Sequence, residues 1–138
     1  MKITFKPQTE WLPPQDFPDL SKYDEIAVDL ETKDPNLNER MGSGSVVGVG
    51  DVVGISLATH DWCAYYPIAH EGGGNMDRKM VLKWLQDQLN TPATKIFHNA
   101  MYDVCWLRAL GLKINGTIVD TMIAASLIDE NRFRYDLN

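Results

Sequence analysis

The alternation of apolar and polar residues predicts a strand near residue 30. In the stretch IAVDLET, residues 26–32, the larger apolar side chains fall at every second position, as in a strand with one buried face. The intervening positions end in two acids, Asp29 and Glu31, which therefore project from one face at the carboxyl end of the strand. Open α/β sheets usually place their functional sites at this end. The pattern thus predicts a strand that presents a pair of carboxylates.

Further strands and helices are predicted after this one. Two runs rich in β-branched and aromatic residues, 52–58 and 62–68, flank a three-residue turn and predict a hairpin. Together with the first strand, the hairpin makes a three-stranded meander. Apolar residues at helical spacing predict a helix over residues 77–90, and the short apolar run 95–97 predicts a buried strand.

A second group of polar residues lies on a helix predicted to begin near Asn99. Gly111 is the expected stop of this helix. Asn99 and Asp103 are four positions apart and share a face, and Tyr102 lies beside them. Residues 117–119 then predict another strand. The helix therefore carries polar side chains near its N-terminal end in an otherwise apolar sequence.

Other segments have a structural interpretation. Asp120 precedes a helix that runs to residue 128, and we interpret it as an N-cap rather than a metal ligand, because aspartate is common at that position. The glycine-rich stretch 41–51 lacks the spacing of a phosphate-binding loop and any helix pattern after it, so we interpret it as a mobile loop. Residues 1–22 contain four prolines and predict an extended arm, in which residues 2–5 pair as an edge strand.

Composition and charge narrow the class of protein. A chain of 138 residues with 44% hydrophobic residues is sufficient for the core of one domain. No apolar run reaches the length of a membrane span and no signal peptide is present, so we expect a cytoplasmic protein without a membrane partner. Cys63 and Cys105 form no C-x-x-C pair and are interpreted as reduced core thiols. The net charge of −6 has the wrong sign for a domain that binds nucleic acid mainly by phosphate neutralisation, but cations held by carboxylates, or a basic neighbouring domain, would still bind a strand end.

The two acids of the first strand predict a metal site. Carboxylates this close repel each other unless a cation or a shared proton lies between them. Oxygen ligands suit hard ions such as Mg²⁺ or Mn²⁺. Taken alone, the D-x-E pattern also fits a solvated strand end or a helix cap. A Ca²⁺ site made by Asp29, Glu31 and Asp34 is a further alternative, but the Asp-Gly loop spacing of such sites is missing.

The order of elements and the two polar motifs together resemble the proofreading 3′-5′ exonuclease domain of family A DNA polymerases, a part of the DEDD exonuclease superfamily. The motifs are VDLET at residues 28–32 and HNAMYD at residues 98–103. Supporting matches are VVGISLA at 52–58, YYPIAH at 65–70 and DTMIAASLID at 120–129. The resemblance spans residues 23–138, and the glycine-rich insertion looks like phage versions of the family.

This resemblance implies a fold and a domain plan. The fold would be α/β: a ribonuclease H-like mixed sheet, with an antiparallel three-stranded meander plus parallel strands, flanked by helices and incomplete at its C-terminal end. Residues 1–22 would be an extended arm, and residues 23–138 a partial exonuclease domain. A polymerase domain would lie in the same full-length chain, and the location would be the cytoplasm of a bacterial host if a phage encodes the protein.

It also implies an activity and its residues. The activity would be hydrolysis of the terminal phosphodiester at the 3′ end of single-stranded DNA, with two divalent cations, Mg²⁺ or Mn²⁺. His98 is left out of the catalytic set and interpreted as structural. The implied catalytic residues, which are also the metal ligands, are Asp29, Glu31 and Asp103. The implied substrate-binding residues are Thr32 beside the terminal nucleotide and Asn99 and Tyr102 in the strand-end pocket.

One motif of the family is missing. The third motif, Y-x-x-x-D, supplies a tyrosine that positions the water and a fourth carboxylate, whereas Tyr135 and Asp136 are adjacent. We therefore expect the fourth ligand beyond Asn138, weak nuclease activity or none for residues 1–138, and exposed apolar surface on the helix at 122–128. The alternative is a non-catalytic ribonuclease H-like module that holds DNA or has a structural role. The intact acids argue against it, because a dead domain has no reason to bury clustered anions.

Overall fold

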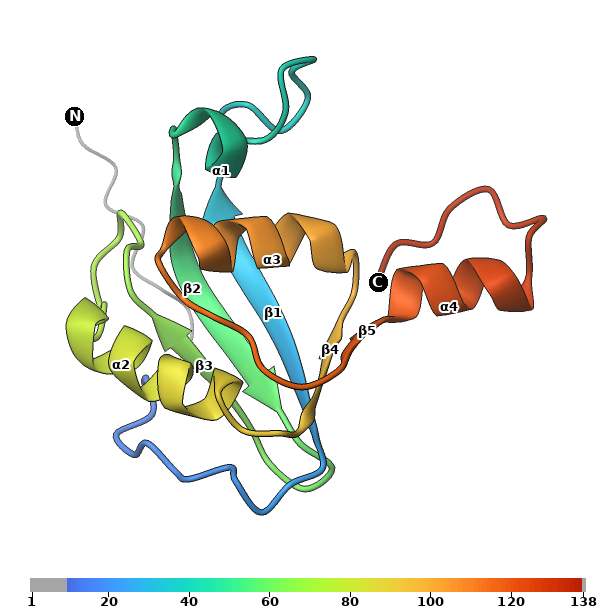
Figure 1. Ribbon diagram of the computed structural model, residues 1–138. Helices are drawn as coiled ribbons and strands as arrows, with labels where there is room; N and C mark the ends of the chain where they lie inside the picture. Colours follow the sequence, from blue (N-terminus) through green and yellow to red (C-terminus); the bar gives the residue numbers. More distant parts are fainter. Residues whose placement is uncertain (1–9, 138) are drawn as a thin grey trace.

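The structure is a computed structural model that describes residues 10–137, and a five-stranded mixed sheet lies at its centre (Figure 1). The strands are β1 (Glu25–Lys33), β2 (Asp51–Ala58), β3 (Cys63–Pro67), β4 (Thr94–Phe97) and β5 (Ile118–Asp120), and their spatial order is β3-β2-β1-β4-β5. The pairs β1–β2 and β2–β3 are antiparallel, whereas β1–β4 and β4–β5 are parallel. The predicted α/β class, meander and parallel strands are confirmed.

Helices lie mainly on one side of this sheet. They are the one-turn helix α1 (Gly44–Val47) and the longer helices α2 (Arg78–Leu89), α3 (Ala100–Ala109) and α4 (Thr121–Ile128). Figure 1 shows α2 and α3 on the same side of the sheet and α4 projecting away from it. The predicted ends of two helices are also confirmed: Asp77 caps α2 by accepting a bond from the backbone N–H of Met80 at 2.9 Å, and Gly111 follows α3 with φ of 81°.

A single apolar core fills the space between the sheet and the helices α2 and α3. The alternating residues Ile26, Val28 and Leu30 of β1 are buried there, as their spacing predicts. Burial of this kind stabilises a fold by about 25 cal/mol per Å² of apolar surface. Other core residues are Ile55 and Leu57 from β2, Tyr66 from β3, Val81, Trp84 and Leu85 from α2, and Trp106 and Leu107 from α3. Asp29 and Glu31 lie on the opposite face of β1.

The segment before β1 packs along the core without forming a helix or strand over residues 10–22. Leu20 is 1% exposed, and its backbone N–H donates to the Gln88 side chain at 2.8 Å. The indole N–H of Trp84 donates to the carbonyl of Pro18 at 2.8 Å. The segment therefore packs against buried residues of α2. The edge strand predicted at residues 2–5 lies outside the described residues.

The glycine-rich stretch, predicted to be a mobile loop, contains the one-turn helix α1. The carboxylate of Asp34 accepts a bond from the backbone N–H of Gly44 at 2.8 Å and fixes the first residue of this turn. A Cβ at Gly44 would lie 2.2 Å from the carbonyl oxygen of Val49, so only glycine fits. Gly48 ends the turn with φ of 79°. Sequence periodicity misses the helix because four residues are too few to show a period.

The helix α4 has no buried residue. Ile123, Leu127 and Ile128 are 57%, 83% and 87% exposed. This confirms the expectation of exposed apolar surface on this helix. Within residues 10–137, none of the helices combines the length and apolar character needed to cross a membrane.

Both cysteines are free thiols. Cys105 is half-buried on α3, but Cys63 is exposed, so its interpretation as a core thiol is wrong. Cys63 begins the edge strand β3, and its side chain belongs to the face opposite the buried Tyr66.

Candidate active site

The strand β1 presents Asp29 and Glu31 on the face opposite the core. Both side chains are exposed, and the residues paired with them on β2 are Ser56 and Gly54. The register of the β1–β2 pair shifts between Glu31 and Thr32, where a bulge or irregularity interrupts the ladder. The predicted placement of both acids on one face is therefore observed.

The helix α3 contributes a third carboxylate, Asp103, from its first turn. Asp103 is 3% exposed, and its Oδ2 has no hydrogen-bond partner among the described residues. Burial, followed by the negative charges of Asp29, Glu31 and Asp120, raises the pKa of Asp103 to about 7. A buried carboxylate with an unpartnered oxygen is unfavourable unless it binds a proton or a cation. The three predicted acids thus act on one another electrostatically.

These acids are not drawn together into a finished metal site. Within residues 10–137, no group of three or more His, Cys, Asp or Glu side chains is close enough to hold an ion. The chemistry of these side chains nevertheless fits a divalent metal ion. The unpartnered oxygen of Asp103 and the exposed oxygens of Asp29 and Glu31 are hard donors of the kind that Mg²⁺ and Mn²⁺ take.

A hydroxyl pair connects β1 to α3. The Thr32 hydroxyl lies 2.8 Å from the Tyr102 hydroxyl, which donates to Asp34 at 3.0 Å. Burial is the main cause that raises the pKa of Tyr102. The structure therefore brings together two of the three predicted substrate-binding residues.

Asp34 supports this pair and was not predicted as a site residue. Its Oδ1 accepts from the backbone N–H groups of Asn36 at 2.9 Å and Gly44 at 2.8 Å, and its Oδ2 accepts from Tyr102. Both oxygens of Asp34 thus accept hydrogen bonds. The bond to Asn36 is an Asx turn, which aspartate commonly forms with a backbone donor two residues later, so the sequence indicates the turn at Asp34 but not the bond to Tyr102.

Asn99 precedes α3 in a left-handed conformation with φ of 65°, and it is the only non-glycine residue with positive φ among residues 10–137. Asparagine tolerates this conformation better than most residues. The Asn99 side chain makes no capping bond and is exposed. It is therefore available for contact with a ligand.

The cap of α3 comes instead from Asp120. Its carboxylate accepts from the backbone N–H groups of Asn99 at 3.0 Å and Ala100 at 2.9 Å, and also from that of Met122 at 2.9 Å at the start of α4. Burial opposes ionisation, but these backbone donors outweigh it and lower the pKa of Asp120. The N-cap interpretation is confirmed, and one carboxylate caps two helices.

We expect Asp120→Ala to lower the free energy of unfolding by about 2 kcal/mol, because each lost cap costs about 1 kcal/mol. Urea denaturation measures this loss. Ser126→Ala is the matched control, since it removes a hydroxyl bond on α4 that caps nothing. If Asp120→Ala abolished hydrolysis while leaving stability unchanged, Asp120 would belong to the reacting groups instead.

His98, predicted to be structural, contacts two segments that follow it in the chain. Its Nδ1 lies 3.0 Å from the Thr121 hydroxyl, and its Nε2 contacts the backbone carbonyl of Tyr135. The ring thus connects the end of β4 to α4 and to the segment that follows it.

Comparison with known proteins relates the chain to DNA polymerases. The family model DNA_pol_A_exo1, described as 3′-5′ exonuclease, matches residues 14–138. DNA polymerase DpoZ of Acinetobacter phage SH-Ab 15497 is 32% identical over 123 residues, which are 88% of this chain and 17% of that protein. A DNA-directed DNA polymerase of Pseudomonas phage M6 is 31% identical over 136 residues, which are 94% of this chain and 20% of that protein. The chain therefore spans about a fifth of the length of these relatives.

Solved structures share the fold. NrnC of Brucella melitensis superposes with a TM-score of 0.57 at 21% identity, covering 86% of this chain and 51% of that one. Pol1 of M. smegmatis, in complex with DNA primer-template and dNTP, gives a TM-score of 0.57 at 16% identity over 84% of this chain and 18% of that one. With the family match covering nearly the whole sequence and a mixed sheet that carries the paired acids, the chain belongs to the 3′-5′ exonuclease family of A-type DNA polymerases and has its ribonuclease H-like fold.

Proposed function

We propose that the chain removes terminal nucleotides from single-stranded DNA 3′ ends by two-metal hydrolysis, as the proofreading domain of a DNA polymerase. The observation that carries this proposal is Asp103, a buried carboxyl with an unpartnered oxygen beside the charges of Asp29 and Glu31. A protein gains nothing in stability from such an arrangement. It is explained by a positively charged ligand that the fold has to bind.

Asp29, Glu31 and Asp103 would hold two divalent ions, Mg²⁺ or Mn²⁺, and serve as the catalytic carboxylates. When bound, such ions lower the pKa of the attacking water and stabilise the leaving 3′ oxygen. A structure of NrnC described with bound Mg²⁺ supports this choice of ion. Three carboxylates nearly balance the charge of two dications and leave coordination positions for the phosphate.

The 3′ end would lie against Thr32, Asn99 and Tyr102. The joined hydroxyls of Thr32 and Tyr102 are fixed by Asp34, so they offer a preorganised polar surface beside Glu31. A cavity of about 320 Å³ continues from Asn99 and Tyr102 between α1 and α3. Its other lining residues are Ser43, Val46, Met101 and Cys105. We propose that the terminal nucleotides of the strand enter along this surface.

The polymerase relatives support a partner and a location. We propose that the domain works in the same full-length chain as a polymerase domain and receives the 3′ end of its primer strand. Two of these relatives are phage proteins, which supports action in the cytoplasm of a bacterial host.

The proposal is tested by melting the chain with and without Mn²⁺. A ligand that binds only the folded state stabilises it by about 2.7 kcal/mol at a concentration a hundredfold above its Kd. We expect Mn²⁺ to raise the melting temperature and Asp29→Ala to remove the rise. Asp87→Ala is the control, because it removes one exposed acid of α2 far from β1. An unchanged Mn²⁺ response in Asp29→Ala would overturn the metal assignment.

Hydrolysis of a labelled single strand in Mn²⁺ gives the second readout. We expect slow turnover from residues 1–138, because the acids are not gathered within residues 10–137, and its loss in Asp29→Ala and Asp103→Ala. The separation of the acids within residues 10–137 also favours one alternative, a non-catalytic module that holds DNA. That alternative predicts strand binding without any metal-dependent cleavage, and cleavage abolished by Asp29→Ala would exclude it.

A further inference from the structure

A glycine in the middle of β2 is required by a tyrosine that lies over it. Gly54 is buried, and it pairs with Glu31 across the β1–β2 ladder. A Cβ at position 54 would lie 1.8 Å from the hydroxyl oxygen of Tyr65, far inside contact distance. The phenol of Tyr65 therefore occupies the place that any larger residue at 54 would take. Glycine inside a strand often marks such a close approach.

The position of this hydroxyl is fixed by His70. The hydroxyl of Tyr65 is hydrogen-bonded to Nε2 of His70. The backbone of His70 is held in turn by Asn75, whose side chain accepts from the His70 N–H at 2.7 Å and donates to its carbonyl at 2.9 Å. The ring of Trp11 lies against that of Tyr65, with 5.9 Å between centroids. Contacts at both the ring and the hydroxyl therefore hold the Tyr65 side chain in one position.

The sheet register places this hydroxyl beside Glu31. Residues directly opposite each other in an antiparallel pair have Cβ positions about 4.5–5.5 Å apart. The Tyr65 hydroxyl sits close to where a Cβ of Gly54 would be, so the Glu31 carboxylate reaches it by rotation of its side chain. Burial and then the charge of Glu31 raise the pKa of Tyr65, which agrees with this proximity.

We propose that Tyr65, held by His70, is a positioning residue for Glu31. The Nε2–H of His70 donates to the Tyr65 oxygen, and the Tyr65 hydroxyl donates to one oxygen of Glu31, which leaves the other oxygen for a divalent ion. The Glu31 side chain is exposed and has three torsions, so a fixed donor reduces the entropy lost when it binds an ion. This inference rests on the metal site of the proposed function.

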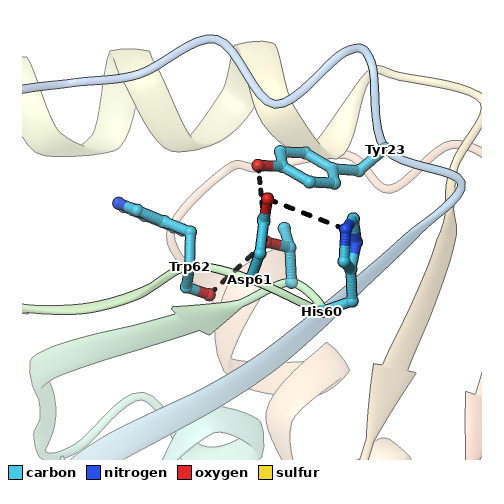
Figure 2. A network of polar contacts seen from close by, with 5 residues as sticks. Tyr23, His60, Asp61 and Trp62 are labelled. Atoms are coloured by element: carbon cyan, nitrogen blue, oxygen red, sulfur yellow. Dashed lines mark hydrogen bonds and ion pairs between the residues drawn. The ribbon is translucent and has the colours of Figure 1, made fainter.

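The test measures Mn²⁺ affinity in the full chain from the electron paramagnetic resonance signal of free Mn²⁺. We expect Tyr65→Phe to weaken the affinity about tenfold, as loss of an outer-shell partner of a metal ligand typically does. Tyr23→Phe is the matched control, because it also removes one hydroxyl bond, that to Asp61 at 2.7 Å, near the start of β1 (Figure 2). We expect no change in Mn²⁺ affinity from Tyr23→Phe. Melting without metal checks that both variants remain folded.

His70→Leu gives an independent variant. If the two side chains act as one unit, the double variant Tyr65→Phe/His70→Leu binds Mn²⁺ as weakly as the weaker single variant, and not additively more weakly. Unchanged Mn²⁺ affinity in Tyr65→Phe, with affinity lost in Asp29→Ala, would overturn the role of Tyr65 while keeping the metal site. Absence of Mn²⁺ binding by the unmodified chain would overturn both.

Discussion

Asp103→Asn should stabilise the metal-free protein at about pH 8 by about 2–4 kcal/mol. Burial raises the pKa of Asp103 from 3.8 to about 7 in the folded state, so the folded protein holds a proton that the unfolded chain releases. The resulting loss of stability begins as pH rises above the unfolded pKa and is complete above the folded pKa. Asparagine has no proton to lose, so the gain from the substitution grows between these two values.

Urea denaturation in a chelator at several pH values measures this gain. Asp87→Asn is the control, since it replaces an exposed acid and should leave the pH dependence as it was. The same Asp103→Asn variant should lose hydrolysis, because an amide is a poorer metal ligand than a carboxylate. If Asp103→Asn had the same stability and the same pH dependence as the unmodified protein, the fold would not raise the pKa of Asp103.

Asp34→Ala should destabilise the protein by about 3 kcal/mol, the sum of about 1 kcal/mol for each of three lost hydrogen bonds. These bonds join Asp34 to the N–H groups of Asn36 and Gly44 and to the hydroxyl of Tyr102. Without them, both the α1 turn and the hydroxyl surface beside Thr32 lose their fixed positions. We therefore expect faster hydrogen exchange at the Gly44 N–H together with the loss of stability.

Two further substitutions distinguish the loss of the Asp34 hydrogen bonds from a nonspecific loss of stability. Asp34→Asn keeps an acceptor oxygen for the backbone donors and should retain most of the stability. Ser43→Ala removes only the hydroxyl contact with Ser45 at 2.7 Å and should leave exchange at Gly44 nearly unchanged. Equal exchange rates in Asp34→Ala and the unmodified chain would show that Asp34 does not hold α1.

Much of the fold follows from local patterns that the sequence displays. The alternation around Asp29 predicts which face of β1 is buried, and Gly111 predicts the end of α3. The Asp120 cap is also predicted from its place before an apolar helix. These features depend on neighbours in sequence. By contrast, local patterns do not show that Asp29, Glu31 and Asp103 form one site. That grouping was predicted only from the resemblance to a known family.

Features that depend on distant partners were not predicted. Asp34 meets Tyr102 across 68 positions, and Tyr65 lies over Gly54 because two strands pair in a given register. Lys95 is fully buried, with its ammonium donating to the carbonyls of Ala93 and Asn115 at 2.9 Å, and burial lowers its pKa. No periodicity marks a lysine as buried, because the bonds that compensate its charge come from loops outside its own strand.

The mixed sheet also has a consequence for the order of folding. The meander pairs strands that are neighbours in sequence, whereas β1 and β4 are separated in the sequence by β2, β3 and α2. Contacts between distant parts of a chain form more slowly than local ones. We therefore expect Asp29 and Glu31 to be placed early, with the meander, and Asp103 to join them late. Its repulsion then falls on the native state more than on the transition state, so that Asp103→Asn should slow unfolding and hardly change the rate of folding, a difference visible in the two arms of a chevron plot.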